Sequence, residues 1–136
     1  MTRICLDSNV LVAAFVARGL CADLLRLVLS EHDLVIPEVV AEEVRHVLST
    51  KLKAGQSALS GVEAVFERCS VVPNSNAPCP ISLRDPDDER VLASALAAGV
   101  EILVSGDQDL LVVAEESPLR ILSPRGFLTL VRGGPP

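Results

Sequence analysis

The chain has 136 residues, a length that suits one domain, and 49% of them are hydrophobic. A domain of this size buries about two-thirds of the surface of its unfolded chain, which is enough for a core of its own. Its 12 basic residues against 18 acidic ones give a net charge of −6, which excludes a basic protein that coats nucleic acid. With three Phe and neither Trp nor Tyr, it is also unlike single-strand binders built on aromatic platforms.

The cysteines predict no metal site of their own. Cys5, Cys21, Cys69 and Cys79 form no CxxC pair and accompany only two histidines, so a zinc site is not expected. We expect reduced, mostly structural cysteines, as in a cytoplasmic protein. Because Asp7 interrupts the first apolar stretch, we expect no signal peptide. No apolar run approaches the roughly 20 residues that a membrane-spanning helix needs.

Short β-branched runs alternate with segments of helical period along the whole chain. In chain order, the first half predicts a strand over 3–6, helices over 10–17 and 21–30, a strand over 33–36, and helices over 37–53 and 57–68. The second half predicts a strand over 70–72, a turn-rich loop over 73–80, a helix over 87–98, a strand over 101–104, a short helix ending at 111, a strand over 119–122 and a last helix that ends before 133.

This alternation predicts one α/β domain over residues 1–136. Right-handed βαβ crossovers place helices on both faces of a mainly parallel sheet of about five strands. In such sheets, ligands bind beyond the carboxyl ends of the strands, so the residues directly after each strand are candidates for a site. Asp7 and Asp107 both follow predicted strands.

Two predicted helices carry an acidic residue on or near their apolar side. On the helix over 37–53, Val40, Val44 and Val47 form the apolar stripe; Glu43 lies about 60° from its centre and Glu42 about 160° away. An unpaired charge on that side of a helix costs several kcal/mol unless a cation meets it. We therefore expect Glu43 to serve a site and Glu42 to face solvent.

On the helix after Pro86, Asp88 lies within about 20° of the apolar centre, whereas Glu89 lies about 90° from it. Asp85 and Asp88 at this helix start could instead act only as capping acids, because first-turn amides favour negative charge. In the same way, Asp7 and Asp107 could each be no more than a cap on the helix that follows.

Taken together, Asp7, Glu43, Asp88 and Asp107 all stand at strand ends or on inward helix faces. Four acids in one cleft cannot all stay ionised without a counter-charge, and no lysine or histidine occupies a matching position. Mg²⁺ or Mn²⁺ is the natural counter-ion because both prefer carboxylate oxygens. Such an ion activates water against phosphodiesters, and Ser8, Asn9 and Ser105 could position the water, the metal or the scissile phosphate. The pattern predicts a metal-dependent nuclease.

Three segments resemble the PIN-domain ribonucleases, in particular the VapC-like toxins of type II toxin–antitoxin systems. RICLDSNVLVAAF resembles the family's first strand, which ends in Asp-Thr-Asn, and PEVVAEEVRHVL resembles its helix with an inward Glu. RDPDDERVLASALAAGVEILVSGDQDLL resembles the long acidic signature that closes in Thr/Ser-Gly-Asp-x-Asp-Leu-Leu, the most specific of the three. The resemblance as a whole runs from about Arg3 to Leu130, and Ser8 stands where the family more often has Thr.

The resemblance implies a three-layer α/β/α PIN-like fold and an RNA-cleaving endonuclease. It assigns the metal site to Asp7, Glu43, Asp88 and Asp107, with Asp109 as an auxiliary acid, and Asp85 matches a frequent family acid. It further implies an RNA substrate, a homodimer and inhibition by a small antitoxin protein. Periodicity and resemblance thus select the same residues on both helices.

Basic residues could contact the RNA backbone, although solvated surface charge is the simpler interpretation of each. The candidates are Arg18, Arg45, Lys51, Lys53, Arg84 and Arg90. Arg84 and Arg90 flank the acidic motif and are the first choices for positioning substrate. The apolar C-terminal helix, with Phe127, Leu128, Leu130 and Val131, is expected to be a core element, with a dimer or antitoxin surface as the alternative.

Two other functions compete with a nuclease. A PIN-like RNA-binding or interaction module without catalysis would lack a site acid, and none of the four is missing. A phosphatase of the haloacid type would need Asp-x-Asp after the first strand, where this chain has Asp7-Ser8-Asn9. A receiver domain would need a lysine after a late strand, but Lys51 and Lys53, the only two lysines, both lie mid-chain.

Overall fold

A computed structural model describes residues 2–133 of the chain. Its elements, in chain order, are β1 (Arg3–Leu6), α1 (Ser8–Val16), α2 (Leu20–Glu31), β2 (Asp33–Pro37), α3 (Glu38–His46), a π-helix (Val47–Lys51), α4 (Gln56–Arg68), β3 (Ser70–Val72), α5 (Pro86–Ala97), β4 (Ile102–Val104), α6 (Gln108–Leu111), a 3₁₀-helix (Ala114–Glu116), β5 (Arg120–Leu122) and α7 (Pro124–Val131).

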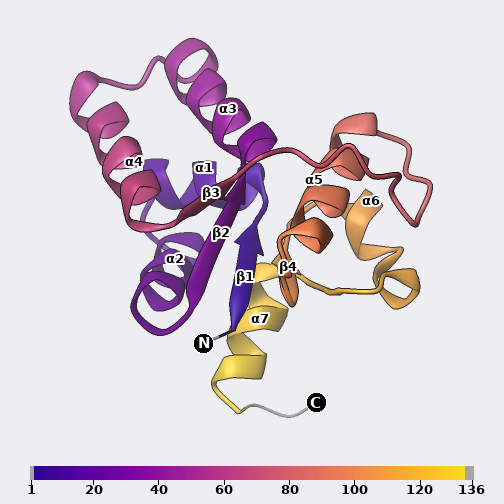
Figure 1. The fold of residues 1–136 in the computed structure, drawn as a ribbon. Coiled ribbons are helices and arrows are strands. Elements are labelled where there is room, and N and C mark those ends of the chain that lie inside the picture. Colours follow the sequence, from indigo (N-terminus) through magenta and orange to yellow (C-terminus); the bar gives the residue numbers. More distant parts are fainter. Residues whose placement is uncertain (1, 134–136) are drawn as a thin grey trace.

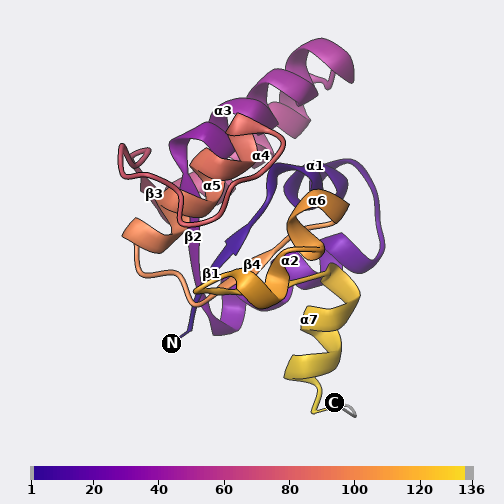
Figure 2. The ribbon, with the colours of Figure 1, turned by 90° about the vertical axis from the view of Figure 1, so that its right-hand side faces the viewer.

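The five strands form one parallel sheet in the order β3-β2-β1-β4-β5. Helices α1, α2 and α4 lie on one side of the strands, and α5 and α6 lie on the other (Figures 1 and 2). This arrangement confirms the predicted three-layer α/β/α fold. Because β1 and β4 are neighbours and run in the same direction, their carboxyl ends meet at one edge of the sheet.

Burial is deepest on the central strand, where Ile4, Cys5 and Leu6 are each 0% exposed. A strand that is covered on both faces needs such a continuous apolar run. The sequence predicts that the C-terminal helix is a core element, with an interaction surface as the alternative. Phe127 and Leu128 are buried in the core, whereas Leu130 and Val131 are exposed. Helix α7 packs against α2 and β5, with the Phe127 ring edge-on to His32.

Helix α3 is shorter than the sequence predicts. The expected helix over 37–53 holds α geometry only to His46 and continues as the π-helix Val47–Lys51. Two hydroxyls turn back onto the preceding carbonyls here: Ser49 Oγ donates to the Arg45 carbonyl at 2.7 Å, and Thr50 Oγ1 donates to the His46 carbonyl at 2.5 Å. Such side-chain bonds compete with the regular helical pattern and are a known cause of irregular turns.

All four cysteines are free, and Cys5 is buried. Burial, followed by the nearby Asp7 charge, raises the pKa of the Cys5 thiol, which suits a small apolar residue in the core. Within residues 2–133, none of the helices combines the length and apolarity needed to cross a bilayer.

Candidate metal centre

Asp7 lies at the carboxyl edge of the sheet, in the residue that directly follows β1. Its backbone N–H donates to the Val104 carbonyl of β4 at 2.9 Å, which continues the pairing of β1 with β4 by one more bond. Asp7 is also the N-cap of α1, since its Oδ1 accepts from the Ser8 N–H at 2.9 Å. The capping role and the site role therefore fall on the same carboxylate, which remains only 4% exposed.

Two polar side chains fix the second oxygen of Asp7. Ser105 Oγ donates to Asp7 Oδ2 at 2.7 Å, and the Asn9 side-chain amide donates to the same oxygen at 3.3 Å. Ser105 Oγ also accepts from the Asp107 N–H at 3.0 Å, and Asn9 Oδ1 accepts from the Gly106 N–H at 3.1 Å. Ser105 and Asn9 thus tie the loop after β1 to the loop after β4.

Asp88 brings a third carboxylate from the first turn of α5. It is 8% exposed, and its Oδ2 is buried without a hydrogen-bond partner among the described residues. One carboxylate oxygen of each of Asp88, Asp107 and Asp109 lies within 4.8 Å of the others. Burial first and the Asp107 charge second raise the pKa of Asp88 to about 7. Capping of α5 is left to Asp85, whose Oδ1 accepts from the Asp87 N–H at 2.9 Å.

The pKa of Asp7 is raised, as that of Asp88 is. Burial is the largest cause that raises the pKa of Asp7, and hydrogen bonds from Ser105 and Ser8 oppose it. The charges of Glu43 and Asp107 add to the increase. Carboxyl groups gathered in this way repel one another unless a cation or protons neutralise them.

Glu43 reaches the same cleft from α3. Its side chain is exposed, as is that of Glu42, but only Glu43 lines the cleft. Helix α3 lies above the carboxyl ends of the strands (Figure 1) and contacts both α1 and α5. Glu43 on this helix lines the same cleft as Asp7, Asp88 and Asp107. No hydrogen bond fixes the Glu43 carboxylate within residues 2–133, in contrast to Asp7 and Asp107.

The cleft has a volume of about 550 Å³ and is bounded by α1, α3, the start of the π-helix, α5 and the loop after β4. Its lining residues are Asp7, Ser8, Asn9, Val12, Ala13, Val16, Glu43, Val47, Asp85, Asp87, Asp88, Val91 and Asp107. Six of them are acids and none is Lys, Arg or His.

The sequence does not predict one part of this lining. An aliphatic wall stands beside the carboxylates and consists of Val12, Ala13 and Val16 of α1 and Val47 of the π-helix. Apolar residues in a helix are read as core by default, and only the packing of α1 against α3 leaves these partly exposed. The sole signal in the sequence is that α1 is apolar nearly all around, a pattern that does not separate the core from a cleft wall.

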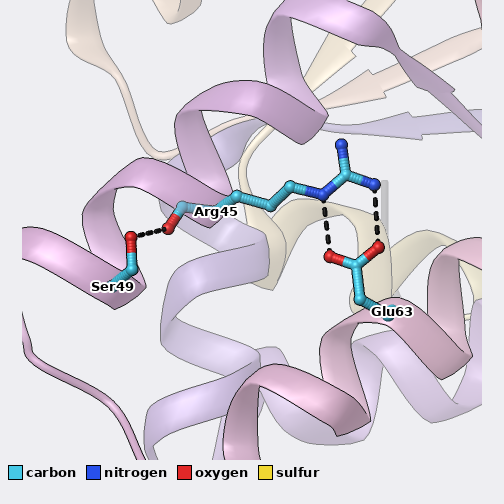
Figure 3. Close-up of polar contacts among 3 residues, drawn as sticks. All are labelled: Arg45, Ser49 and Glu63. Atoms are coloured by element: carbon cyan, nitrogen blue, oxygen red, sulfur yellow. Dashed lines mark hydrogen bonds and ion pairs between the residues drawn. The ribbon is translucent and has the colours of Figure 1, made fainter. Parts of the chain in front are cut away.

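The predicted RNA-contacting residues are scattered. Arg45 pairs with Glu63 of α4 through two bonds, of 2.7 and 2.9 Å (Figure 3). Its guanidinium also lies 5.0 Å above the Phe66 ring. Arg90 lies 3.9 Å from Asp87 and lines a separate pocket with Cys79 and Glu89. The remaining candidates are exposed and in no ion pair among the described residues: Arg18, Lys51, Lys53 and Arg84.

The residues fit a hard divalent cation. Asp88 presents a buried oxygen without a donor, and the neighbouring ligand atoms are carboxylate oxygens, without nitrogen or sulfur. Mg²⁺ and Mn²⁺ prefer this donor set, whereas structural Zn²⁺ prefers Cys and His. Asp88, Asp107 and Asp109, whose ligand atoms lie together, would hold the ion with Asp7 and Glu43, which line the same cleft.

A sequence profile described as the PIN domain matches residues 3–109, which include every one of these acids. The chain belongs to the PIN domain family. No curated protein matches the sequence.

Solved structures share the PIN domain fold at low identity. A chain of the VapBC2 structure from Rickettsia felis, bound to a DNA fragment from its promoter, gives a TM-score of 0.67 at 18% identity, over 90% of this chain and 98% of that one. VapBC-1 from nontypeable Haemophilus influenzae gives 0.64 at 14% identity, over 91% and 99%. A domain of a functionally unknown protein from Methanocaldococcus jannaschii gives 0.59 at 15% identity, over 89% of each chain.

Proposed function

We propose that this PIN domain is a metal-dependent endoribonuclease that hydrolyses RNA phosphodiester bonds. The observation that supports this most directly is the buried, unpartnered Oδ2 of Asp88 beside Asp107 and Asp109. A fold that leaves a carboxylate oxygen buried without a donor loses stability unless something cationic binds there. Catalysis explains the arrangement better than an interaction module does, because every predicted acid lines the same cleft or adjoins it.

When bound, Mg²⁺ or Mn²⁺ would lower the pKa of a coordinated water and stabilise the charge that develops on the phosphate. The protein supplies the geometry. Ser105 and Asn9 fix one oxygen of Asp7, so this carboxylate needs no rearrangement to receive a ligand. Ser8 lines the cleft and carries a hydroxyl within reach of a bound phosphate or water. The aliphatic wall limits how much solvent surrounds the carboxylates, which strengthens their electrostatic interactions.

The decisive experiment is cleavage of a mixed RNA by the purified protein with Mg²⁺ or Mn²⁺. We expect cleavage that stops with EDTA and returns with added metal. Asp7→Asn keeps the shape of the side chain but removes its charge and should reduce the rate by at least about 100-fold, the scale of one essential electrostatic group. Asp23→Asn on α2 is the matched control, because Asp23 is exposed and, within residues 2–133, pairs only with Arg26. Undiminished cleavage by Asp7→Asn would refute the assignment.

We further propose that the enzyme is the toxin of a toxin–antitoxin pair, acts as a homodimer in the cytoplasm and is held inactive by a small antitoxin protein. The shared fold with chains of two VapBC structures supports this. Expression of the wild-type chain should arrest bacterial growth, and Asp7→Asn should not. Co-expression of a small protein encoded next to it should restore growth. Normal growth at a level of wild-type protein confirmed by immunoblot would argue for a housekeeping nuclease instead.

A further inference from the structure

The cleft holds no positive charge of its own. None of its lining residues is basic, although each nucleotide of an RNA strand brings a negatively charged phosphate. A metal ion offsets charge only at the scissile phosphate. Phosphates on either side of it therefore approach acidic residues and need cations at the rim of the cleft.

Several basic side chains are already engaged elsewhere. Arg3 pairs with Asp33, and Arg26 pairs with Asp23. Arg45 is held by Glu63 in the two-bond pair of Figure 3. Arg90, one of the two first choices from the sequence, pairs at 3.9 Å with Asp87, one of the acids that line the cleft. Each of these residues would have to give up its existing ion-pair partner in order to contact RNA.

Three exposed cations without an ion-pair partner in the described part of the chain stand close in sequence to residues that line the cleft. Arg18 lies two residues beyond Val16, the last wall residue on α1. Lys51 ends the π-helix that begins with the wall residue Val47. Arg84 directly precedes Asp85, which lines the cleft on the side of α5. The three residues, which we call the rim cations, thus stand one to four residues along the chain from lining residues on three different borders of the carboxylate cleft.

The burial of Asp7 and Asp88 determines whether single-stranded or duplex RNA can bring a phosphate to them. Asp7 is 4% and Asp88 is 8% exposed, so a scissile phosphate must enter the cleft to approach them. A single strand can bend inward and place its sugar and base against the aliphatic wall, whereas a duplex keeps its phosphates on a stiff outer surface. Packing of a base on Val and Ala side chains also requires no aromatic residue, in agreement with the composition.

We propose that a single RNA strand crosses the cleft with its flanking phosphates on Arg18, Lys51 and Arg84. This inference rests on the proposed nuclease function and specifies how that site holds its substrate. It replaces Arg90 with Arg18 and Lys51 as partners of Arg84. The rim cations hold the strand and take no part in bond cleavage.

The test is the salt dependence of RNA binding. A fluorescein-labelled single-stranded RNA is titrated with full-length Asp7→Asn protein, which keeps the strand intact, and binding is followed by fluorescence anisotropy over a range of KCl concentrations. Three phosphate contacts predict a slope of log K against log salt of about −2, and each of Arg18→Gln, Lys51→Gln and Arg84→Gln should make it shallower by about 0.7. In the wild-type background, the same changes should raise KM several-fold and leave kcat unchanged.

Arg120→Gln is the matched control, because Arg120 is exposed at the start of β5, the opposite end of the strand from the cleft. It should leave the slope unchanged, and so should Arg90→Gln. Because the rim side chains are exposed, the variants should keep the thermal midpoint of the parent, which circular dichroism checks. Equal slopes for the rim variants and Arg120→Gln would overturn the proposal, as would tighter binding of a duplex than of the single strand.

The two proposals can fail separately. RNA binding that depends on the rim cations, without cleavage by the wild-type protein in any divalent metal, would refute the nuclease and leave the binding path standing. Cleavage with KM values that are indifferent to all three substitutions would refute the path and leave the nuclease standing. Absence of both cleavage and binding would refute both.

Discussion

At the scale of single residues, a few buried carboxylates are the groups whose ionisation is unfavourable in the metal-free fold. Asp7 has hydrogen bonds to both of its oxygens, whereas Asp88 has a buried oxygen with none. Both have a raised pKa, which means that the metal-free fold favours their protonated forms. A carboxyl group with a raised pKa in the folded state contributes stability at acidic pH that is lost as the pH rises.

The first prediction concerns this pH dependence. Without metal, the wild-type protein should lose stability as the pH rises from the ordinary carboxyl range through about 7, the pKa of Asp88. Asp88→Asn removes the ionisation and should be more stable than wild type by about 1 kcal/mol near pH 8, or about 3 °C in Tm, a value discounted because solvent reaches the cleft. Thermal melts in EDTA near pH 5 and pH 8 measure the difference; Asp23→Asn should show none. A variant destabilised more at pH 8 than at pH 5 would contradict it.

At this scale, the sequence indicates which acids gather at the cleft more readily than it indicates which cations are engaged in ion pairs. Asp7 and Asp107 are found because each directly follows an apolar strand, and Asp88 is found from the apolar face of its helix. For Arg45, unlike Arg26 and Arg90, whose partners lie three residues away on the same helix, the partner is distant in sequence. Arg45 and Glu63 are 18 residues apart and meet only because α3 packs against α4. Helical periodicity does not contain that information.

At the scale of elements, α3 forms one border of the cleft and is joined to α4 by the Arg45–Glu63 pair. The Arg45 guanidinium also covers the Phe66 ring, which stands edge-on to Phe15 of α1 at 6.5 Å between ring centroids. The pair thus connects three helices, two of which line the cleft. The sequence predicts the helices themselves but not the change from α to π geometry after His46, because both geometries accept the same residues.

The second prediction concerns this pair. In a double-mutant cycle of Arg45→Met and Glu63→Gln, we expect a coupling energy of about 0.5 kcal/mol, since both side chains are about half exposed. The Arg45 hydrogen bonds lower the pKa of Glu63, so the coupling should be complete above the ordinary carboxyl pKa and disappear as the pH falls through the lowered one. Urea denaturation near pH 7 and pH 3 measures it. Coupling that is stronger at pH 3 would contradict the assignment.

At the scale of the whole molecule, the net charge of −6 conceals its distribution. Six of the 18 acids line one cleft, so the excess of negative charge is focused where a cation would bind. The fold, five parallel strands with helices on both faces, follows from the alternation of strand and helix patterns. The distribution of charge follows from the fold, because the parallel strands bring the residues after β1 and β4 to one edge.

The third prediction is therefore that divalent metal stabilises the whole fold. A ligand at 100 times its Kd adds about 2.7 kcal/mol, which for this length corresponds to an increase of about 9 °C in Tm. Thermal melts with increasing Mn²⁺ measure it in the absence of RNA. Asp88→Asn should abolish most of the increase, and Asp23→Asn should retain it. Equal increases in all three proteins would mean that the ion binds elsewhere.

The hydrogen bond from Ser105 to Asp7 joins residues 98 positions apart. A chain growing on the ribosome carries Asp7 long before Ser105, which is added 98 residues later, and Asp107 follows Ser105. Long-range pairing of this kind forms late, after the separating segments have been made and have closed into place. A chain stopped before β4 would contain the first strand and no functional cleft. For a protein proposed to destroy RNA, this order of synthesis keeps unfinished chains harmless to the message that encodes them.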